Sequence, residues 1–395
     1  ERRAAVSREL ENLVAAAGRG DELDEPELAA RAALASADIF RVQGPLQAGV
    51  QVLEQASEDV DDEDLLAMLA LERGDLLRLS GETQEAAEAL EEAIEADDAV
   101  VQARAKVRLA LVRASQRKPD EANELLAAAL KNAKRARNKA LQAEALRGQG
   151  IVATDTGDAE LGLEKLRAAL KLRRRLGDRR GEGMELGNVA VVLRRMGELE
   201  EAAEAAEEAA EAHREVGNAM SLGSTLLSLA MIQHMQGLAA EAEATYRAAL
   251  EVQRRVGNRR AESITAGNRG VALQDLGRLT EAEDALSDAI DIAEEVEAKQ
   301  VECVHSAALA DVMLERDEPE DAEIHLERAM EIAEAFGAKG FIATFKILES
   351  RIKLADDDVD AAAEALAEAA PVIDERGSPD DRAKLAAQQG QVALA

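Results

Sequence analysis

The chain has 395 residues, 80 acidic against 48 basic, a formal net charge of −32, 47% hydrophobic residues and only 1% aromatic residues. This length exceeds one ordinary hydrophobic core, and a single cysteine, Cys303, excludes an internal disulfide framework. Because we find no secretion signal and no apolar run long enough to cross a bilayer, we expect a cytoplasmic protein with no membrane insertion, and the first residue, Glu1, suggests a fragment or a processed product.

The first 26 residues differ in pattern from the rest. Residues 1–17 are alanine-rich and predict a helix, and the segment GRGDELDE that follows predicts an acidic loop. From residue 27 onward a turn position recurs, with a spacing of 40 residues after Arg117. The turn positions are Gly44, Gly81, Arg117, Gly157, Gly197, Gly237, Gly277, Asp317 and Asp357. This period predicts a helix A, a tight turn and a helix B in each repeat.

Small residues keep a fixed distance from each turn. Seven residues before it stand Ala37, Gly74, Ala110, Gly150, Ala190, Ala230, Gly270, Ala310 and Ser350. Five residues after it stand Gly49, Ala86, Ala122, Gly162, Ala202, Ala242, Ala282, Ala322 and Ala362. Twelve residues after it, alanine occurs in every repeat, from Ala56 to Ala369. Such registers let paired helices approach closely while larger residues fill the groove between them, namely Leu90, Leu126, Leu166, Tyr246, Leu286 and Leu326.

Glycine occurs both at the turn within a repeat and at the junction between repeats. At the turn it ends helix A in a left-handed conformation without steric cost. A second glycine joins helix B to the next helix A at Gly177, Gly217, Gly257, Gly337 and Gly377. After Gly377, the last segment predicts a helix with Gly390 at the small position; it is either a capping helix or a truncated tenth repeat, and we favour continuation of the native chain.

These small and large positions resemble the tetratricopeptide repeat (TPR) pattern. The resemblance implies an all-α, right-handed superhelical solenoid of antiparallel helix pairs, with nine repeats over 27–376 between the region 1–26 and the helix 377–395. The usual TPR period is about 34 residues. The longer period here is similar to that of kinesin light chain and of bacterial TPR regulators that join an ATPase or a kinase to a helical array.

Nothing in the sequence predicts catalysis. The four histidines, His213, His234, His305 and His325, are scattered over different repeats, and Cys303 is two residues from His305, where a helix turns the two side chains apart. A metal site needs several converging ligands, and a phosphate loop needs a preceding strand. We therefore expect no enzyme activity, no cofactor and no metal.

The TPR resemblance implies a peptide-binding groove along the A helices. The positions that line it are Arg104, Arg108, Arg147, Thr154, Asn188, Arg194, Arg195, Ser228, Met231, His234, Asn268 and Gln274. Asn188 and Asn268 match an asparagine with which many TPRs hold a ligand backbone. Gly187 and Gly267 stand where a carboxylate-clamping cation would, which argues against capture of a terminal carboxylate. The alternative is that these residues are merely exposed.

Positive charge is concentrated in residues 131–180, which hold 14 Lys and Arg against 6 Asp and Glu. The basic strip that we predict consists of Lys134, Arg135, Arg173, Arg174, Arg175, Arg179, Arg180, Arg254 and Arg255. It would dock an acidic or phosphorylated segment; the alternative is that cations simply favour helix C-termini. Nucleic acid is disfavoured because the rest of the chain is acidic.

The sequence thus predicts a non-catalytic scaffold that binds a protein or peptide partner through its concave face and through the basic strip of repeats 3–6. The competing hypothesis is a sensor arm of a larger signalling protein, which would act on a kinase, ATPase or protease effector domain of the same full-length chain.

Overall fold

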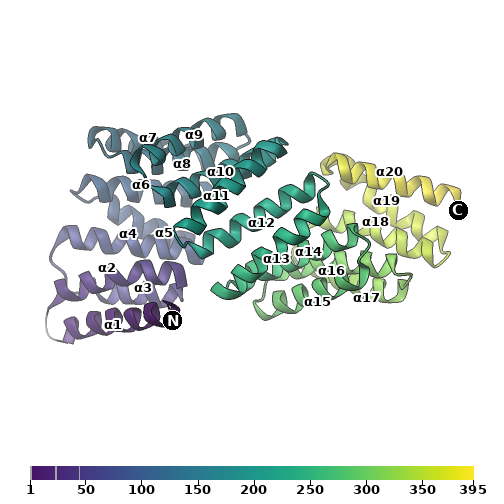
Figure 1. Ribbon diagram of the computed structural model, residues 1–395, viewed down its shortest axis with the longest axis horizontal. Coiled ribbons are helices and arrows are strands. Elements are labelled where there is room, and N and C mark those ends of the chain that lie inside the picture. Colours follow the sequence, from purple (N-terminus) through teal and green to yellow (C-terminus); the bar gives the residue numbers. More distant parts are fainter. Residues whose placement is uncertain (1, 23–24, 44) are drawn as a thin grey trace. The chain divides into compact units, whose positions relative to one another are not determined.

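The computed structural model describes residues 2–22, 25–43 and 45–395, and these residues form twenty α-helices and no strand (Figure 1). The all-α prediction is confirmed. The chain divides into two compact units, Glu1–Val216 and Gly217–Ala395, hereafter unit 1 and unit 2. Within each unit, every helix packs against the next one along the chain.

Unit 1 contains eleven helices in the part of the chain that is described. They are α1 (Arg2–Glu22), α2 (Pro26–Gln43), α3 (Leu46–Gln55), α4 (Glu63–Ser80), α5 (Thr83–Ile94), α6 (Ala99–Ser115), α7 (Pro119–Arg135), α8 (Lys139–Asp155), α9 (Ala159–Leu176), α10 (Arg179–Met196) and α11 (Leu199–Glu215). Helix α1 extends to Glu22, so the predicted end of this helix at residue 17 is wrong.

Unit 2 contains nine helices. They are α12 (Ala219–Met235), α13 (Ala239–Val256), α14 (Arg259–Asp275), α15 (Leu279–Glu295), α16 (Lys299–Glu315), α17 (Pro319–Ala335), α18 (Lys339–Ala355), α19 (Val359–Arg376) and α20 (Pro379–Leu394). From α2 to α19 the even-numbered helices are the A helices and the odd-numbered ones the B helices. The B helices have 17 or 18 residues, except α3 with 10 and α5 with 12.

The turns adopt the predicted left-handed conformation. Positive φ angles occur at Gly81, Gly157, Gly197, Gly237 and Gly277. Arg117, Asp317 and Asp357 take the same conformation, with φ of 60°, 67° and 61°, although a left-handed residue with a side chain costs about 1–2 kcal/mol. The repeat therefore imposes the turn even without glycine. Gly44 lies outside the described residues.

The junctions between repeats follow the same rule with one exception. Gly177, Gly217, Gly257 and Gly337 have positive φ angles. Gly377 is extended instead, with φ of −65° and ψ of 147°, so the predicted turn there is wrong. The cause lies in the next two residues, because Ser378 precedes Pro379 and forms the capping box that starts α20.

The three small registers form the core. All of their members are buried, as predicted, and the large groove residues are buried between them. A Cβ atom added at Gly74, Gly150 or Gly270 would lie only 2.6 to 2.7 Å from the Cγ atom of the leucine in the paired B helix. The close approach of the A and B helices thus depends on these side chains being small.

The structure also shows buried registers that the sequence pattern did not bring out. Sixteen residues after each turn from Arg117 onward, near the end of helix B, stand Ala133, Arg173, His213, Gln253, Ala293, Ala333 and Ile373, and all seven are buried. Five residues before the small residue of helix A, Glu185 and His305 are buried as well. Polar residues in these registers are therefore part of the packing between helices.

Candidate functional site

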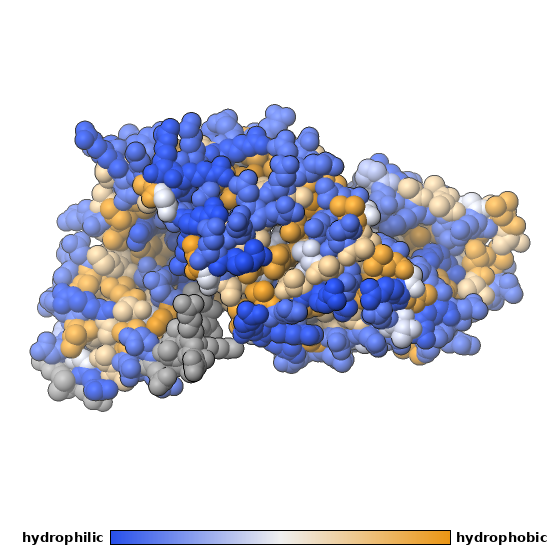
Figure 2. All heavy atoms as spheres, in the orientation of Figure 1, coloured by the Kyte–Doolittle hydropathy of each residue, from blue (hydrophilic) through white to orange (hydrophobic). Residues whose placement is uncertain are grey.

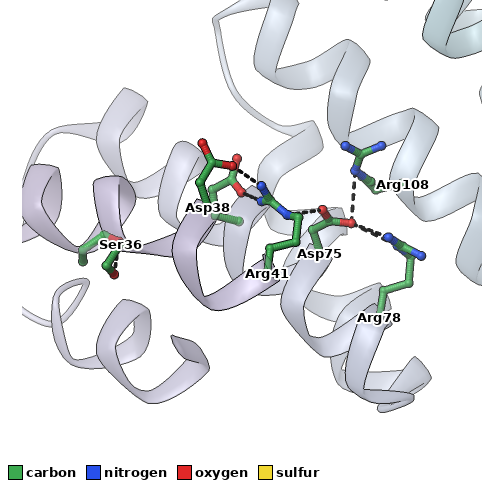
Figure 3. A network of polar contacts seen from close by, with 8 residues as sticks. Ser36, Asp38, Arg41, Asp75, Arg78 and Arg108 are labelled. Carbon is green, nitrogen blue, oxygen red and sulfur yellow. Dashed lines mark hydrogen bonds and ion pairs between the residues drawn. The ribbon is translucent and has the colours of Figure 1, made fainter. Parts of the chain in front are cut away.

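In unit 1, part of the predicted groove is engaged in ion pairs between neighbouring A helices. The buried carboxylate of Asp75 on α4 accepts from Arg41 Nε of α2 at 3.1 Å and from Arg78 Nη2 at 2.7 Å, and pairs with Arg108 Nε of α6 at 3.1 Å. Figure 3 shows these three guanidinium groups converging on Asp75. Burial alone would raise the pKa of the Asp75 carboxyl, but the guanidinium groups outweigh it and the pKa lies below its usual value.

The pairing continues further along unit 1. Arg195 of α10 pairs with Asp155 of α8 at 3.1 Å, and the Thr154 hydroxyl donates to the Gly150 carbonyl of its own helix at 2.8 Å. Arg147 is half-buried, and this burial lowers its pKa even though the nearby Glu185 carboxylate opposes the shift. Arg108, Arg147, Thr154 and Arg195 therefore already have partners or cover within the fold.

Unit 2 has a similar row along its A helices. His234 Nε2 of α12 lies 2.6 Å from Asp275 Oδ2 of α14. The Gln274 amide of α14 donates to Asp311 of α16 at 3.1 Å and to Glu315 at 2.9 Å, and Arg351 of α18 also bonds to Asp311. A hollow of about 290 Å³ is lined by residues of α16, α18 and α20, which include Arg351 and Gln388.

A smaller set of the predicted groove residues is uncommitted, meaning that their side chains have no hydrogen bond or ion pair with any described residue. Among the described residues we find no hydrogen-bond or ion-pair partner for the side chains of Arg104, Asn188, Ser228 or Asn268, while Arg194 does have an interaction. Asn188, Ser228 and Asn268 occupy the same repeat position, two residues before the small residue, and all three are half-buried. Met231, at the position just after the small residue, is half-buried too. These side chains can still donate to or accept from a bound molecule.

The basic strip differs from the prediction at one residue. Arg173 is buried, with 6% of its surface exposed, and pairs with Asp178 at 2.9 Å; the fully buried Glu185 lies 3.5 Å from its Nε atom. Arg173 is thus part of the packing at the end of α9 and not of an exposed strip. Its register, sixteen residues after a turn, is the signal that could have revealed this.

Four exposed cations of the strip, Lys134, Arg135, Arg174 and Arg175, lie on α7 and α9. A shallow hollow of about 530 Å³ on α9 is lined by Arg167, Leu170, Lys171, Arg174 and Arg175. Arg174 pairs with carboxylates of α10 and α11, whereas Lys171 and Arg175 have no ion pair within the described part of the chain. Strongly hydrophilic residues cover the surface over α7 and α9 in Figure 2. The sequence prediction did not include Arg167 or Lys171.

The remaining strip residues fall into two groups. Arg179 pairs with Glu215 at 2.6 Å, and Arg254 pairs with Glu262 at 2.8 Å. The exposed side chains without an ion pair to any described residue are those of Lys134, Arg135, Arg180 and Arg255. Together with Arg175, this makes five strip cations that have no ion pair to a described residue; four of them lie in unit 1, and only Arg255 of these five lies in unit 2.

The histidines occupy four different helices, and Cys303 shares α16 with His305. Cys303 is buried and its thiol donates to the Ala329 carbonyl, and burial lowers the pKa of His305 to about 4. No three His, Cys, Asp or Glu side chains of the described residues come together as metal ligands would. Nor does any described helix combine the length and the apolar character needed to cross a membrane.

Comparison with known structures gives the same fold. A STAND protein (a signal transduction ATPase with numerous domains) with a tetratricopeptide repeat sensor, from Pyrococcus horikoshii, matches with a TM-score of 0.64 and 16% identity, over 82% of this chain and 50% of that one. The chain therefore spans about half of the length of that protein. The apo form of RapI matches with a TM-score of 0.65 and 14% identity, over 83% of this chain and 98% of that one.

A Rap protein complexed with competence and sporulation factor matches with a TM-score of 0.53 and 14% identity, over 80% of this chain and 99% of that one. Comparison with curated protein sequences gives no match. The family model of the C-terminal domain of suppressor of spindle checkpoint defect 1 matches residues 74–175. The model of the MalT-like TPR region matches residues 190–395, which is more than half of the chain. With its paired helices, left-handed turns and small-residue registers, the chain belongs to the MalT-like TPR family.

Proposed function

We propose that the chain is a non-catalytic interaction module that binds a peptide or protein partner against its A helices. In unit 2, the side chains of Ser228 on α12 and Asn268 on α14, the A-helix row, have no partner among the described residues and carry this proposal, and Asn188 takes the same repeat position in unit 1. Their neighbours already bond to adjacent A helices, so a polar side chain left without a partner at the same repeat position favours a role in binding. An asparagine amide both donates and accepts, which suits an extended peptide backbone.

The exposed cations of α7 and α9 give this module a preferred partner charge. Lys134, Arg135, Lys171 and Arg175 have no ion pair with any described residue, and the α9 pair flanks the apolar Leu170 in the hollow. They would attract an acidic or phosphorylated segment and raise its association rate, and this attraction would weaken with salt. A polyanion such as nucleic acid fits less well, because the whole chain carries a net charge of −32.

The fold comparisons support a binding role in general terms. A Rap protein with a similar fold has been solved as a complex with competence and sporulation factor. A fold likeness at 14% identity does not carry the ligand over to this chain, so the residues above carry the proposal.

The experiment uses a short acidic peptide selected by phage display on the unmodified chain and labelled for fluorescence anisotropy. Asn268→Ala should raise its Kd at least about tenfold, which corresponds to about 1.4 kcal/mol. Gln300→Ala is the matched control, because Gln300 is an exposed amide in the first turn of α16. Equal affinity of the two variants for the peptide would refute the role of the A-helix row.

The strip is tested with the same peptide by its association kinetics. Lys171→Glu combined with Arg175→Glu should slow association and flatten its salt dependence, with a smaller change in the dissociation rate. The control reverses two other exposed cations, Arg214 and Arg260. If both double variants slow association equally, only net charge matters and the strip has no specific role.

A second candidate is a sensor arm that controls an effector domain of a longer chain. It is favoured by the match to a STAND protein that has a tetratricopeptide repeat sensor and half of whose chain is covered. In that case a selected peptide should change the activity of an effector expressed on the same polypeptide. A peptide that binds tightly without changing that activity would leave the scaffold role and exclude the sensor role for this ligand.

A further inference from the structure

The first two B helices, α3 and α5, are shorter than all the later ones. Helix α3 has 10 residues and α5 has 12, against 17 or 18 in α7 to α19. At 1.5 Å per residue, the missing turns amount to about 8–12 Å of helix. Both helices belong to unit 1, and both flank α4.

The two short repeats differ at the position that the later repeats bury near the end of helix B: in the repeat of α3 it is Val60, which is buried although it lies beyond the helix, and in the repeat of α5 it is exposed. In every repeat from Arg117 onward, the residue sixteen positions after the turn lies within helix B and is buried, as Ala133 is in α7. In the repeat of Gly81 this residue is Asp97, which lies beyond the end of α5 at Ile94 and is exposed. The packing position near the end of a full-length B helix is therefore vacant in this repeat.

A pocket of about 390 Å³ opens where these turns are missing. Its lining includes the half-buried Leu66 of α4 and Ala96 of the loop after α5, together with Leu53 of α3 and Leu69 of α4, which are buried. Figure 2 shows hydrophobic residues reaching the surface over this end of unit 1. An apolar side chain that entered the pocket would leave water and contact these residues. Burial of its apolar surface would contribute roughly 25 cal/mol of favourable binding free energy per Å².

The rim of the pocket is acidic. Its charged lining consists of four carboxylates and one guanidinium, and that guanidinium, Arg73, is already paired with Glu92 at 2.7 Å. The carboxylates of Glu63, Glu95 and Asp97 have no ion pair with any described residue. Cations placed beside an apolar anchor therefore complement both parts of the pocket.

We propose that this pocket, formed by α3, α4 and α5, docks a basic amphipathic peptide segment of a protein partner, whose apolar side chain supplies the missing end of helix B while its Lys or Arg side chains meet Glu63, Glu95 and Asp97. None of these residues belongs to the A-helix row or to the basic strip. The proposal therefore stands independently of the function proposed above, and it assigns to unit 1 a second binding site of opposite charge preference.

The test uses a fluorescein-labelled peptide of leucine and lysine residues in helical register, added to the full chain. Glu95→Lys combined with Asp97→Lys should raise its Kd at least about tenfold. Glu204→Lys combined with Glu207→Lys is the matched control, because it makes the same charge change at two exposed acidic residues of α11 that have no ion pair to a described residue. The control should bind the peptide with nearly unchanged affinity.

A second variant and second probes separate the pocket from nonspecific attraction. Ala96→Trp fills the pocket without a change of charge and should also weaken binding at least about tenfold, with an unchanged far-UV CD spectrum. A peptide in which serine replaces leucine should bind much more weakly. Equal loss in the α11 control, equal binding of the serine peptide, or unaltered binding to Ala96→Trp would each overturn the proposal. An aliphatic monoamine that binds as tightly as the peptide would assign the pocket to a small cation instead and would likewise overturn it.

Discussion

Replacing Gly267 with alanine should destabilise unit 2, and removing the His305 ring should reverse the sign of this effect. Gly267 lies inside helix α14, where alanine is intrinsically more stable than glycine by about 1 kcal/mol. A Cβ atom at Gly267 would, however, lie 2.1 Å from Cε1 and 2.4 Å from Nε2 of His305 on α16. His305 is 4% exposed, so its ring cannot simply move into solvent.

Overpacking of this kind costs about 1–3 kcal/mol, which exceeds the gain in helix propensity. We therefore expect Gly267→Ala to lower the free energy of unfolding by up to about 2 kcal/mol, that is, the overpacking cost less the propensity gain. In the His305→Ala background the steric conflict is gone, and the same substitution should stabilise by about 0.5–1 kcal/mol. The two backgrounds thus give effects of opposite sign, and their difference is the coupling energy of a double-mutant cycle.

The assay is native-state hydrogen exchange of the α14 and α16 amides, because a repeat array does not have to unfold in one step. Gly390→Ala serves as control, since a Cβ atom there meets no other atom within 4 Å and alanine should stabilise α20 in both backgrounds. Stabilisation by Gly267→Ala in the presence of His305, or an equal loss in both backgrounds, would refute the packing argument.

Two further predictions concern buried charge. Asp75→Asn leaves the guanidinium groups of Arg41, Arg78 and Arg108 without their shared carboxylate, and it should cost unit 1 about 3–5 kcal/mol in hydrogen exchange of α4; a loss below 1 kcal/mol would mean that the network contributes little. His305 has a pKa of about 4 in the folded chain against 6.5 in the unfolded chain. Below pH 6.5 the unfolded chain therefore binds a proton at this ring that the folded chain does not, and the free energy of unfolding falls by up to about 3 kcal/mol as the pH drops toward 4. Between pH 7 and pH 4.5, the urea midpoint should fall less in His305→Gln than in the unmodified chain. An equal fall in both proteins would contradict the role of His305.

Much of the fold could be predicted from the sequence because its period is long and regular. The turn at Arg117 is an example, since only the spacing from Gly157 marks it and yet its φ angle is 60°. The buried small registers follow from the same period. The extended backbone at Gly377 could not be predicted in this way, because the adjacent Ser378–Pro379 capping box overrides the repeat there.

The site was less accessible to sequence reasoning. Arg173 and Arg174 are neighbours in a basic run, but α9 buries the first against Asp178 and leaves the second exposed. Likewise, Gln274 and Asn268 of α14 both belong to the predicted groove, and the position of α16 gives Gln274 its partners, while Asn268 has none among the described residues. Which polar residues are uncommitted depends on the distance between helices, and a sequence pattern does not contain that distance.

The central claim is that a partner lies against the A helices, and photo-crosslinking tests it most directly. A display-selected peptide with a photoreactive phenylalanine analogue at each position in turn would be bound to the full chain, irradiated and mapped by mass spectrometry. The account predicts crosslinks to α12 and α14 around Ser228 and Asn268, and their loss upon competition with unlabelled peptide. Crosslinks confined to the B helices α13 and α15 would contradict it.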